Sequence, residues 1–391
     1  MNSNHLITLA LLFCCCQPNG ESPNEENPVI HLSIDNSKID FLSPVTIPHT
    51  VAIFTIEKEL SYGIGSKFGD FYKINDLLLI VDRRASEITC IDTDGKVVWI
   101  PDPPSPEVER YTHIGTIDID YDQKEIYIED RLNLKIDVYA YDGRFLRSIP
   151  VNMGFMEYVV LGKNNLLFDI SDVEPYRTAG DESPPMKFMH QKDNEVNFTG
   201  EMPTGVNYDA IPWNSRNRFN RIGSSIQHRR PWENEVFAIY PDYSSKKILE
   251  FKFARSSGFV DVANRPNIGD VRGKLVEEHL AIPNYLLYDQ EQNRLYCGFW
   301  MNDVHYLSCT VGDQKIVQPA EFYRFNEFYL RAPEYYSDGQ FFQQLFRYEF
   351  EYLQTAFKDQ YSREKIRTDL AELEAQYGDN DDIFIIVIEL R

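Results

Sequence analysis

The feature that most constrains the fold is a repeat near the start of the chain, whose two copies lie 48 residues apart. Residues 77–98 and 125–146 align without a gap and share six identities in 22 positions. The matched pairs are Ile80/Ile128, Asp82/Asp130, Arg83/Arg131, Ile88/Ile136, Asp94/Asp142 and Gly95/Gly143. A chain that repeats a unit of this length builds its fold from copies of one supersecondary element.

Each copy reads as an antiparallel meander. An apolar run ends in Asp, a polar bend and a second alternating run follow, and Asp-Gly opens a third run. Asp-Gly between β-prone runs predicts a hairpin with a type I′ turn, in which both central residues have positive φ. A period of roughly 40–50 residues is typical of the four-stranded blades of β-propellers, and it is too long for leucine-rich or tetratricopeptide repeats.

Further strand-rich segments bring the number of such units to six. They follow short alternating runs in 29–56 and comprise residues 158–171 with 187–203, 234–253, 284–311, and 341–347 with 382–391. The C-terminal run "IFIIVIEL" must be buried, and in a propeller it can pair into a blade shared with the N-terminus, which closes the ring. The sequence therefore predicts an all-β fold, a six-bladed β-propeller of four-stranded antiparallel blades.

One region before the last strand has helical periodicity. Its apolar residues are Phe350, Leu353, Ala356, Phe357, Ile366, Leu370 and Leu373. This spacing predicts a helical excursion at about 348–377, inserted before the C-terminal strand. Such a stripe usually packs on the protein's own core, here the final blade, and a partner-binding helix is the alternative.

The start of the chain has the pattern of a leader and a tether. An apolar run from Leu6 to Phe13 is too short to span a bilayer and stops at three cysteines. This is typical of a bacterial lipoprotein signal, and we predict that Cys15 is lipidated, with Cys14 and Cys16 as alternatives. An ordinary apolar N-terminal strand is the competing interpretation. The predicted organisation is a signal peptide at 1–16, a flexible tether at 17–28 and the propeller at 29–391.

With these features the chain resembles the six-bladed β-propeller lipoproteins of Bacteroidetes, whose blades are similar to NHL repeats. The likeness rests on the leader ending in cysteines, on the paired blades "LLLIVD…IDTDGKV" and "IYIED…AYDGRF", and on a helix followed by "GDNDDIFIIVIELR". The resemblance implies a lipoprotein of the bacterial cell envelope, anchored in the outer membrane. Family members often carry a Gly-rich loop after the first blade, and "PSPEVERY" stands there instead.

The charge of the chain excludes one class of partner. Lys and Arg total 39 against 61 Asp and Glu, which gives a formal net charge of −22. A field of this sign opposes binding to nucleic acid. The partners that remain are a small molecule, a glycan or a protein, with a membrane reached only through the lipid anchor.

No local motif predicts a metal, a cofactor or a catalytic residue. The eight histidines form no HxH or HxxxH pattern, although His113 and His305 could meet near the axis from separate blades. No Gly-x-Ser-x-Gly elbow is present. Cys297 and Cys309 lie symmetrically about Asp303, so a hairpin loop at 302–304 would let them face each other and oxidise. Two buried free thiols are the more common outcome.

Residues 211–235 concentrate basic and aromatic side chains in an acidic chain. The candidate ligand-binding residues there are Trp213, Arg216, Arg218, Arg221, Arg229, Arg230 and Trp232. Arginines beside flat aromatic faces suit carboxylate, sulfate or sugar recognition through paired hydrogen bonds and stacking. The alternative is a long solvated connection between blades whose arginines pair with the abundant acids.

Together these patterns favour a lipid-anchored binding or scaffolding module of the envelope that captures an anionic or carbohydrate ligand. The rival hypothesis is an envelope lyase or hydrolase with its active site in the axial funnel of the propeller. An enzyme needs converging titratable residues, and the sequence displays none locally, so a non-catalytic role is favoured.

Overall fold

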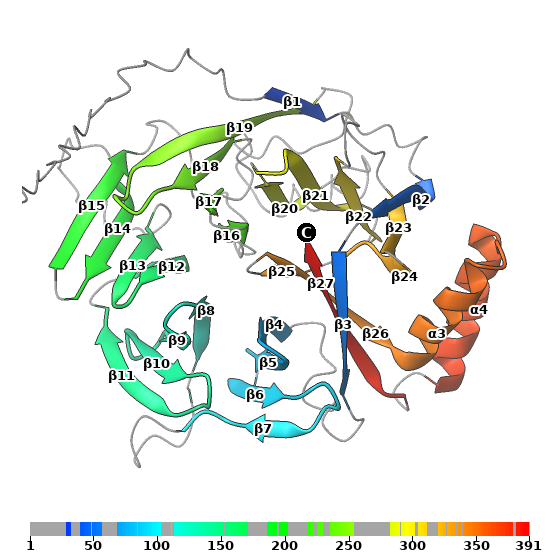
Figure 1. Ribbon diagram of the computed structural model, residues 1–391, viewed down its shortest axis with the longest axis horizontal. Helices are drawn as coiled ribbons and strands as arrows, with labels where there is room; N and C mark the ends of the chain where they lie inside the picture. Colours follow the sequence, from blue (N-terminus) through cyan, green and yellow to red (C-terminus); the bar gives the residue numbers. More distant parts are fainter. Residues whose placement is uncertain are drawn as a thin grey trace, which may run out of the picture.

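A computed structural model shows sheets arranged as blades around a central axis, as predicted (Figure 1). The structure describes residues 29–32, 40–47, 49–56, 69–83, 85–102, 111, 113–151, 154–155, 157–170, 186–193, 195–201, 218–222, 225–229, 235–253, 282–289, 291–301, 304–310, 320–325, 327–333, 335–337, 339–377 and 381–390. Within them, six sheets with mainly antiparallel strands form the six blades.

Blades 1 to 3 are each built from four consecutive strands. Blade 1 contains β4 (Gly69–Ile74), β5 (Leu77–Asp82), β6 (Glu87–Ile91) and β7 (Val97–Trp99). Blade 2 contains β8 (Ile114–Asp120), β9 (Glu125–Asp130), β10 (Lys135–Ala140) and β11 (Phe145–Pro150). Blade 3 contains β12 (Glu157–Gly162), β13 (Asn165–Asp169), β14 (Met186–Lys192) and β15 (Glu195–Glu201). The first strand of each blade lies nearest the axis (Figure 1).

Blades 4 to 6 each include one strand from the start of the chain. Blade 4 joins β16 (Phe219–Ile222), β17 (Ser225–His228), β18 (Glu235–Ile239) and β19 (Ser245–Phe253) to β1 (Val29–Leu32). Blade 5 joins β20 (Ile282–Asp289), β21 (Arg294–Met301), β22 (Val304–Cys309), β23 (Ala320–Phe325) and β24 (Phe328–Arg331) to β2 (Asp40–Ile47). Blade 6 joins β25 (Tyr335–Ser337), β26 (Gln340–Phe346) and β27 (Ile383–Leu390) to β3 (His49–Ile56).

The ring closes where an early strand, β3, pairs with the last strand. The last strand, β27, pairs antiparallel with β3 along its whole length, from Ile383 opposite Ile56 to Leu390 opposite His49. This confirms the prediction that the apolar C-terminal strand enters a blade shared with the N-terminus. The strands β1 and β2 add in parallel to the outer strands β19 and β23, so the start of the chain covers the outer edges of blades 4 and 5.

The hydrophobic core lies between the blades, and each of the six interfaces has its own cluster of buried side chains. Blades 1 and 2, for example, bury Leu79 and Val81 against Ile117 and Ile119. Apolar residues therefore cover both faces of each sheet, which explains the near-continuous apolar runs that mark the strands.

Two helices interrupt blade 6, as the periodicity predicts. They are α3 (Arg347–Ala356) and α4 (Arg363–Tyr377), and both lie on the outside of the ring (Figure 1). Leu353 of α3 and Ile366 of α4 are fully buried in a cluster with Phe322 of β23 and Phe41 of β2. The helical insertion thus packs on blade 5 as well as on blade 6.

The repeated Asp-Gly turns do not have the predicted type I′ geometry. Gly95 and Gly143 both have φ of 82°, but the aspartates before them are not among the described residues with positive φ. The Gly95 N–H donates to the Asp92 carbonyl at 3.0 Å, and the Asp92 N–H donates to the Lys96 carbonyl at 3.0 Å. This is a type I turn followed by a left-handed glycine, the three-residue alternative for hairpins.

The hypothesis that Cys297 and Cys309 face each other is wrong. The β21–β22 register places Cys297 opposite Ser308 and Cys309 opposite Tyr296, one step away from the symmetric pairing. Because neighbouring positions point to opposite faces of a sheet, Cys297 enters the cluster between blades 4 and 5, whereas Cys309 enters the cluster between blades 5 and 6. Both are buried free thiols, and burial raises the pKa of each to about 12.

Candidate functional site

The two faces of the propeller differ in the connections that leave them. Strands alternate in direction within a blade. The starts of the first and third strands and the ends of the second and fourth strands therefore lie on the same face of the propeller. We call this the long-connection face, since residues 57–68, 171–185, 202–217 and 254–281 and the helical insertion join strand ends there. The opposite, short-turn face carries the Asp-Gly turns and most of the other tight turns.

A repeated charged position marks the long-connection face. In blades 1 to 4 the second strand ends at Asp82, Asp130, Asp169 and His228, and the next residues are Arg83, Arg131, Ile170 and Arg229. The equivalence of blades 2 and 4 is visible in the backbone, where the N–H groups of Arg131 and Arg229 donate to the carbonyls of His113 and Arg218. Acidic and basic groups therefore occupy equivalent positions at the strand ends of these blades.

Between blades 3 and 4 this position is occupied by a completely buried charge cluster. The Oδ2 atom of Asp169 lies 3.1 Å from Arg218 Nη1 and 2.8 Å from His228 Nε2, and all three residues have 0% exposure. Charges that are removed from water in this way are costly unless they are paired. We therefore assign Arg218 a role in joining the two blades.

Glu157, the first residue of β12, lies beside this cluster. Its carboxylate accepts hydrogen bonds from the backbone N–H groups of Arg218, at 2.9 Å, and Phe219, at 3.4 Å. Burial disfavours the ionised form and outweighs these bonds and the nearby Arg218 charge, so the pKa of Glu157 rises to about 8. Glu157 is thus the acidic group here with a pKa near neutrality.

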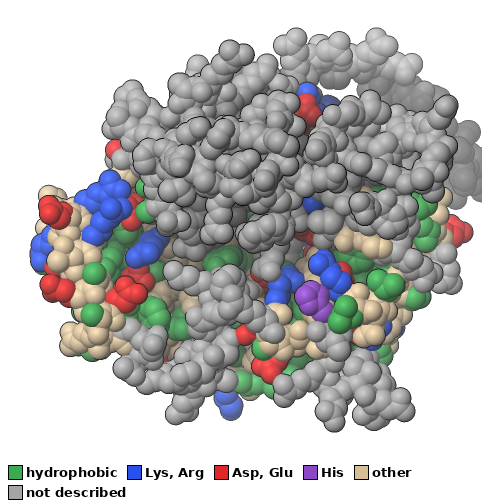
Figure 2. Space-filling view, turned by 180° about the vertical axis from the view of Figure 1, so that it is seen from behind, with side chains coloured by type: hydrophobic (Ala, Val, Ile, Leu, Met, Phe, Trp, Pro, Cys, Tyr) green, Lys and Arg blue, Asp and Glu red, His purple; other side chains and the backbone are tan. Residues whose placement is uncertain are grey.

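Between blades 1 and 2 the same face is more open. Arg83 pairs with Asp70 through its Nε atom at 2.5 Å and donates to the Ile114 carbonyl at 3.2 Å. Glu129 accepts from Arg131 Nε at 2.9 Å, and the Arg131 side chain is 46% exposed. A view of the molecule from behind shows basic side chains next to a histidine, to the right of and below the centre, with acidic side chains near them (Figure 2).

The structure separates the seven residues that the sequence singles out in 211–235. Arg218, Arg221 and Arg229 belong to or flank the hairpin of β16 and β17, so the interpretation of 219–228 as connecting loop is wrong. Trp213, Arg216, Arg230 and Trp232 lie outside the described residues, as does Cys15. The hairpin escaped notice because it lies next to the axis, where its polar residues Asn220, Arg221, Gln227 and His228 break the apolar alternation.

The described arginines of this stretch are not freely exposed. Arg218 pairs with Asp169, Arg221 pairs with Asp118 at 3.0 Å, and Arg229 is only 6% exposed. These contacts match the alternative in which the arginines pair with the chain's own acids. The sequence signal that does locate the charged face is the repeated Asp-Arg of Asp82-Arg83 and Asp130-Arg131.

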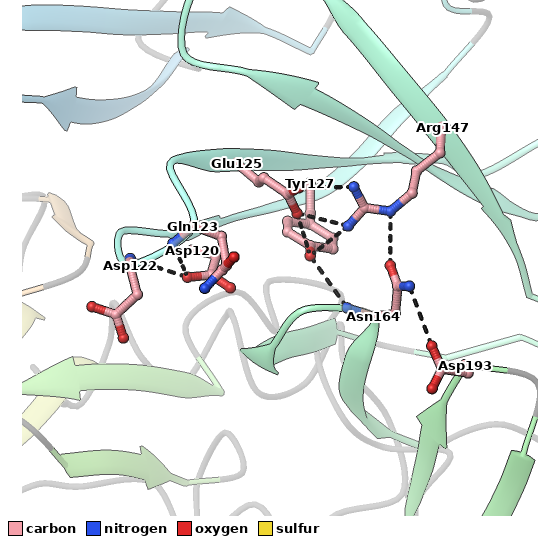
Figure 3. Close-up of polar contacts among 8 residues, drawn as sticks. All are labelled: Asp120, Asp122, Gln123, Glu125, Tyr127, Arg147, Asn164 and Asp193. Carbon is pink, nitrogen blue, oxygen red and sulfur yellow. Dashed lines mark hydrogen bonds and ion pairs between the residues drawn. The ribbon is translucent and has the colours of Figure 1, made fainter.

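A second polar network lies nearer the short-turn face, between blades 2 and 3 (Figure 3). Arg147 of β11 donates to both Glu125 oxygens, at 2.8 and 2.6 Å, and its Nε atom donates to Asn164 Oδ1 at 2.7 Å. Asn164 in turn donates to Asp193 at 3.3 Å. Because these partners sit on strands and turns of both blades, the network is a clamp between blades.

The candidate metal ligands do not meet. His113 is exposed before blade 2, whereas His305 is buried in blade 5 next to the Ala332 carbonyl, and burial lowers its pKa to about 3. Among the described residues there is no group of three or more His, Cys, Asp or Glu arranged to hold a metal ion. No helix in the described part of the chain is long and apolar enough to cross a membrane.

The comparison with protein families agrees with this architecture. The family DUF5128, described as "6-bladed beta-propeller", matches residues 68–332. The chain belongs to this family. No curated protein matches the sequence.

One solved structure shares the fold of this family member at low sequence identity, and two others are similar at lower TM-scores. A candidate exported protein from Bacteroides fragilis is 12% identical with a TM-score of 0.61, over 93% of this chain and 100% of that chain. A DUF4221 family member from Bacteroides vulgatus is 9% identical with a TM-score of 0.45, over 89% and 99% of the two chains. Virginiamycin B lyase from Staphylococcus aureus is 13% identical with a TM-score of 0.37, over 68% and 73%.

Proposed function

We propose that this propeller is a lipid-anchored binding module of the bacterial envelope, which captures a carbohydrate on its long-connection face. The observation that carries the proposal is the difference between the two faces: long connections leave the face on which the charged strand ends lie. Loops held in place by a rigid scaffold are where binding residues concentrate. The anchor at Cys15 and the outer-membrane location are part of this proposal.

A carbohydrate fits the charge arrangement better than an anion does. Four arginines near the axis already have carboxylate partners: Arg83 with Asp70, Arg131 with Glu129, Arg218 with Asp169, and Arg221 with Asp118. Their charge is compensated within a chain of net charge −22, so little attraction is left for a second anion. Arg131, which is 46% exposed, still offers hydrogen-bond donors to hydroxyl groups, whereas Arg218 and Asp169 are fully buried.

The contacts that remain for a ligand fall to four residues of the stretch 211–235. Trp213 and Trp232 would supply flat faces for stacking on a sugar ring, and Arg216 and Arg230 would supply planar donors. The three described arginines would instead hold the blades that carry these residues.

The test is a binding screen by isothermal titration calorimetry against neutral oligosaccharides (maltoheptaose, xylohexaose) and polyanions (polygalacturonate, a sulfated heparin fragment). We expect a neutral oligosaccharide to bind, and the Trp213→Ala/Trp232→Ala variant to weaken it at least ten-fold. Arg144→Ala, an exposed change on the short-turn face, is the matched control and should leave the affinity unchanged.

Two results would decide against a carbohydrate ligand. Binding of the polyanions alone, lost in Arg216→Ala/Arg230→Ala, would identify an anion-binding module instead. Binding that survives both double variants would remove the stretch 211–235 from the site.

A second candidate function, a lyase or hydrolase, is favoured by Glu157. A carboxyl group with a pKa of about 8 is protonated at neutral pH and is suited to general acid catalysis. Its neighbours Asp169, Arg218 and His228 are fully buried, however, so none of the three can contact a substrate in this conformation. Mass spectrometry of the same oligosaccharides after incubation tests this role: products that disappear in Glu157→Gln would favour the enzyme.

A further inference from the structure

Arg221, near the end of the inner strand of blade 4, contacts three blades besides its own. Its Nη2 atom lies 3.0 Å from Asp118 Oδ2 of blade 2 and donates to the Val160 carbonyl of blade 3. The Val160 N–H donates to the same Asp118 oxygen at 2.5 Å. The side chain therefore reaches past the inner strand of blade 3 to the blade beyond it.

The backbone of Arg221 is held from the other direction. The Tyr336 hydroxyl of blade 6 donates to the Arg221 carbonyl and accepts from the Gly339 N–H at 3.0 Å. Blade 5 lies between blades 4 and 6 in the ring (Figure 1). The bond between Tyr336 and Arg221 therefore runs on the axial side of β20, the inner strand of blade 5.

Packing supports the same link between blades 4 and 6. Ile222, which follows Arg221, is 8% exposed and belongs to the apolar cluster formed by blades 5 and 6, together with Tyr336 and Phe341. A Cβ atom on Gly339 would lie 3.7 Å from the Arg221 carbonyl oxygen, so the turn of blade 6 touches blade 4 directly.

We infer that Arg221 and Tyr336 form a brace across the axis of the propeller, which joins blades 2, 3, 4 and 6 and clamps blade 5 between its neighbours. The strand pairing of β3 with β27 closes the ring in blade 6, and the brace adds a second link between blades near the axis. The inference concerns the mechanics of the ring and does not depend on the identity of any ligand.

Blade 5 carries natural reporters of this clamp. Cys297 is buried at its interface with blade 4, and Cys309 is buried at its interface with blade 6. Cys90 is buried between blades 1 and 2, away from the brace. A buried thiol reacts with an aqueous reagent only when its surroundings open, so labelling rates measure opening at each interface separately.

The experiment compares thiol labelling by Ellman's reagent, resolved by mass spectrometry, in the full chain with Cys14, Cys15 and Cys16 changed to Ser. Tyr336→Phe removes only the hydroxyl that bonds to Arg221. We expect Cys297 and Cys309 to be labelled at least about five-fold faster in this variant, because the lost hydroxyl donates one hydrogen bond to the Arg221 carbonyl and accepts another from the Gly339 N–H. The labelling rate of Cys90 should stay within two-fold.

Tyr158→Phe is the matched control, because it removes a buried tyrosine hydroxyl that donates to the Tyr127 carbonyl at 2.8 Å between blades 2 and 3. It should leave the labelling of Cys297 and Cys309 unchanged. Equal acceleration of all three cysteines in Tyr336→Phe would show general destabilisation, and unchanged rates at Cys297 and Cys309 would show that blade 5 is held without Tyr336; either result would overturn the brace.

Discussion

At the scale of single residues, this propeller places ionisable side chains where two blades meet. Asp169, Arg218 and His228 have no exposed surface, and Glu157 faces Asp169 across the β12–β13 ladder. Burial at this interface disfavours the ionised form of Glu157, and the nearby charge of Asp169 adds to the effect. The raised pKa of Glu157 is the consequence, and it makes the contact between blades 3 and 4 sensitive to pH.

We predict that the contribution of Glu157 to the stability of the protein falls as the pH rises from about 4.5 to about 8, and that Glu157→Gln reduces this fall. Glu157 has a pKa of about 8 in the folded chain and an ordinary value near 4.5 when unfolded. The folded state therefore holds the proton more tightly, and this stabilisation is lost as the pH rises through the folded value. Thermal unfolding of both proteins at a series of pH values measures it. Parallel pH profiles would contradict the assignment.

At the scale of elements, turns and strand ends act as contacts between neighbouring blades. The Asp-Gly turn of blade 2 lies against Trp99 of blade 1, where a Cβ atom on Gly143 would come within 2.7 Å of the indole. In blade 4 the equivalent left-handed position is Tyr243, with φ of 66°, and its ring stacks on His190 of blade 3 at 3.7 Å between centroids. In blade 4 the Tyr243 side chain itself contacts the neighbouring blade, whereas in blade 2 Gly143 leaves room for the Trp99 side chain of blade 1.

We predict that Arg147→Met destabilises the protein by about 2 kcal/mol, since it leaves the partly buried Glu125 and Asn164 without their charged partner. The effect should shrink at acid pH. Hydrogen bonding to Arg147 lowers the pKa of Glu125, so the stabilisation is present above the unfolded value of this group and is lost as the pH falls through the folded value. Urea unfolding of the unchanged protein and of the variant at pH 7 and pH 3.5 measures the loss of stability and its decrease at acid pH.

Arg144→Met is the matched control for this prediction. The Arg144 side chain is 63% exposed and lies 4.0 Å from Asp142, so its loss should change the stability by less than about 0.5 kcal/mol. Equal effects of the two substitutions would show that the Arg147 network does not join the blades.

The elements that sequence reasoning found are those with strong local patterns. Asp-Gly at 94–95 and 142–143 predicted the hairpins, but the turn type depends on how far the flanking strands twist, which the dipeptide alone does not determine. The inner hairpin of blade 4 was missed because residues next to the axis need no apolar alternation. The ion pairs Arg218–Asp169 and Arg221–Asp118 join residues far apart in sequence, so their partners could not be read from spacing.

At the scale of the whole molecule, the ring depends on one seam, the pairing of β3 with β27 in blade 6. The Asp-Gly turn of blade 1 packs on this seam, because a Cβ atom on Gly95 would lie 2.0 Å from the Thr55 carbonyl oxygen. The Thr55 N–H also donates to the Thr93 carbonyl at 3.3 Å. The repeated glycine that first revealed the fold therefore helps to hold blade 1 against the closing strand.

We predict that Gly95→Ala destabilises the protein by about 3 kcal/mol, from its positive φ and from the collision with the Thr55 backbone. Gly162→Ala is the control, since Gly162 also has a positive φ, 145°, but a Cβ atom there meets nothing within 4 Å. It should cost about 1 kcal/mol. Urea unfolding measures both, and equal losses would mean that the seam tolerates the added methyl group.

The seam also dictates the order in which the molecule can assemble. The strands β1, β2 and β3 are synthesised before the other described strands, yet their partners β19, β23 and β27 come late, and His49 pairs with Leu390. Blades 1 to 3 can form from consecutive strands during synthesis, whereas blades 4 to 6 must wait for the early segment to dock. Pairing over such separations gives a high contact order and slow folding. The finished ring is thus available only after β27 has been synthesised.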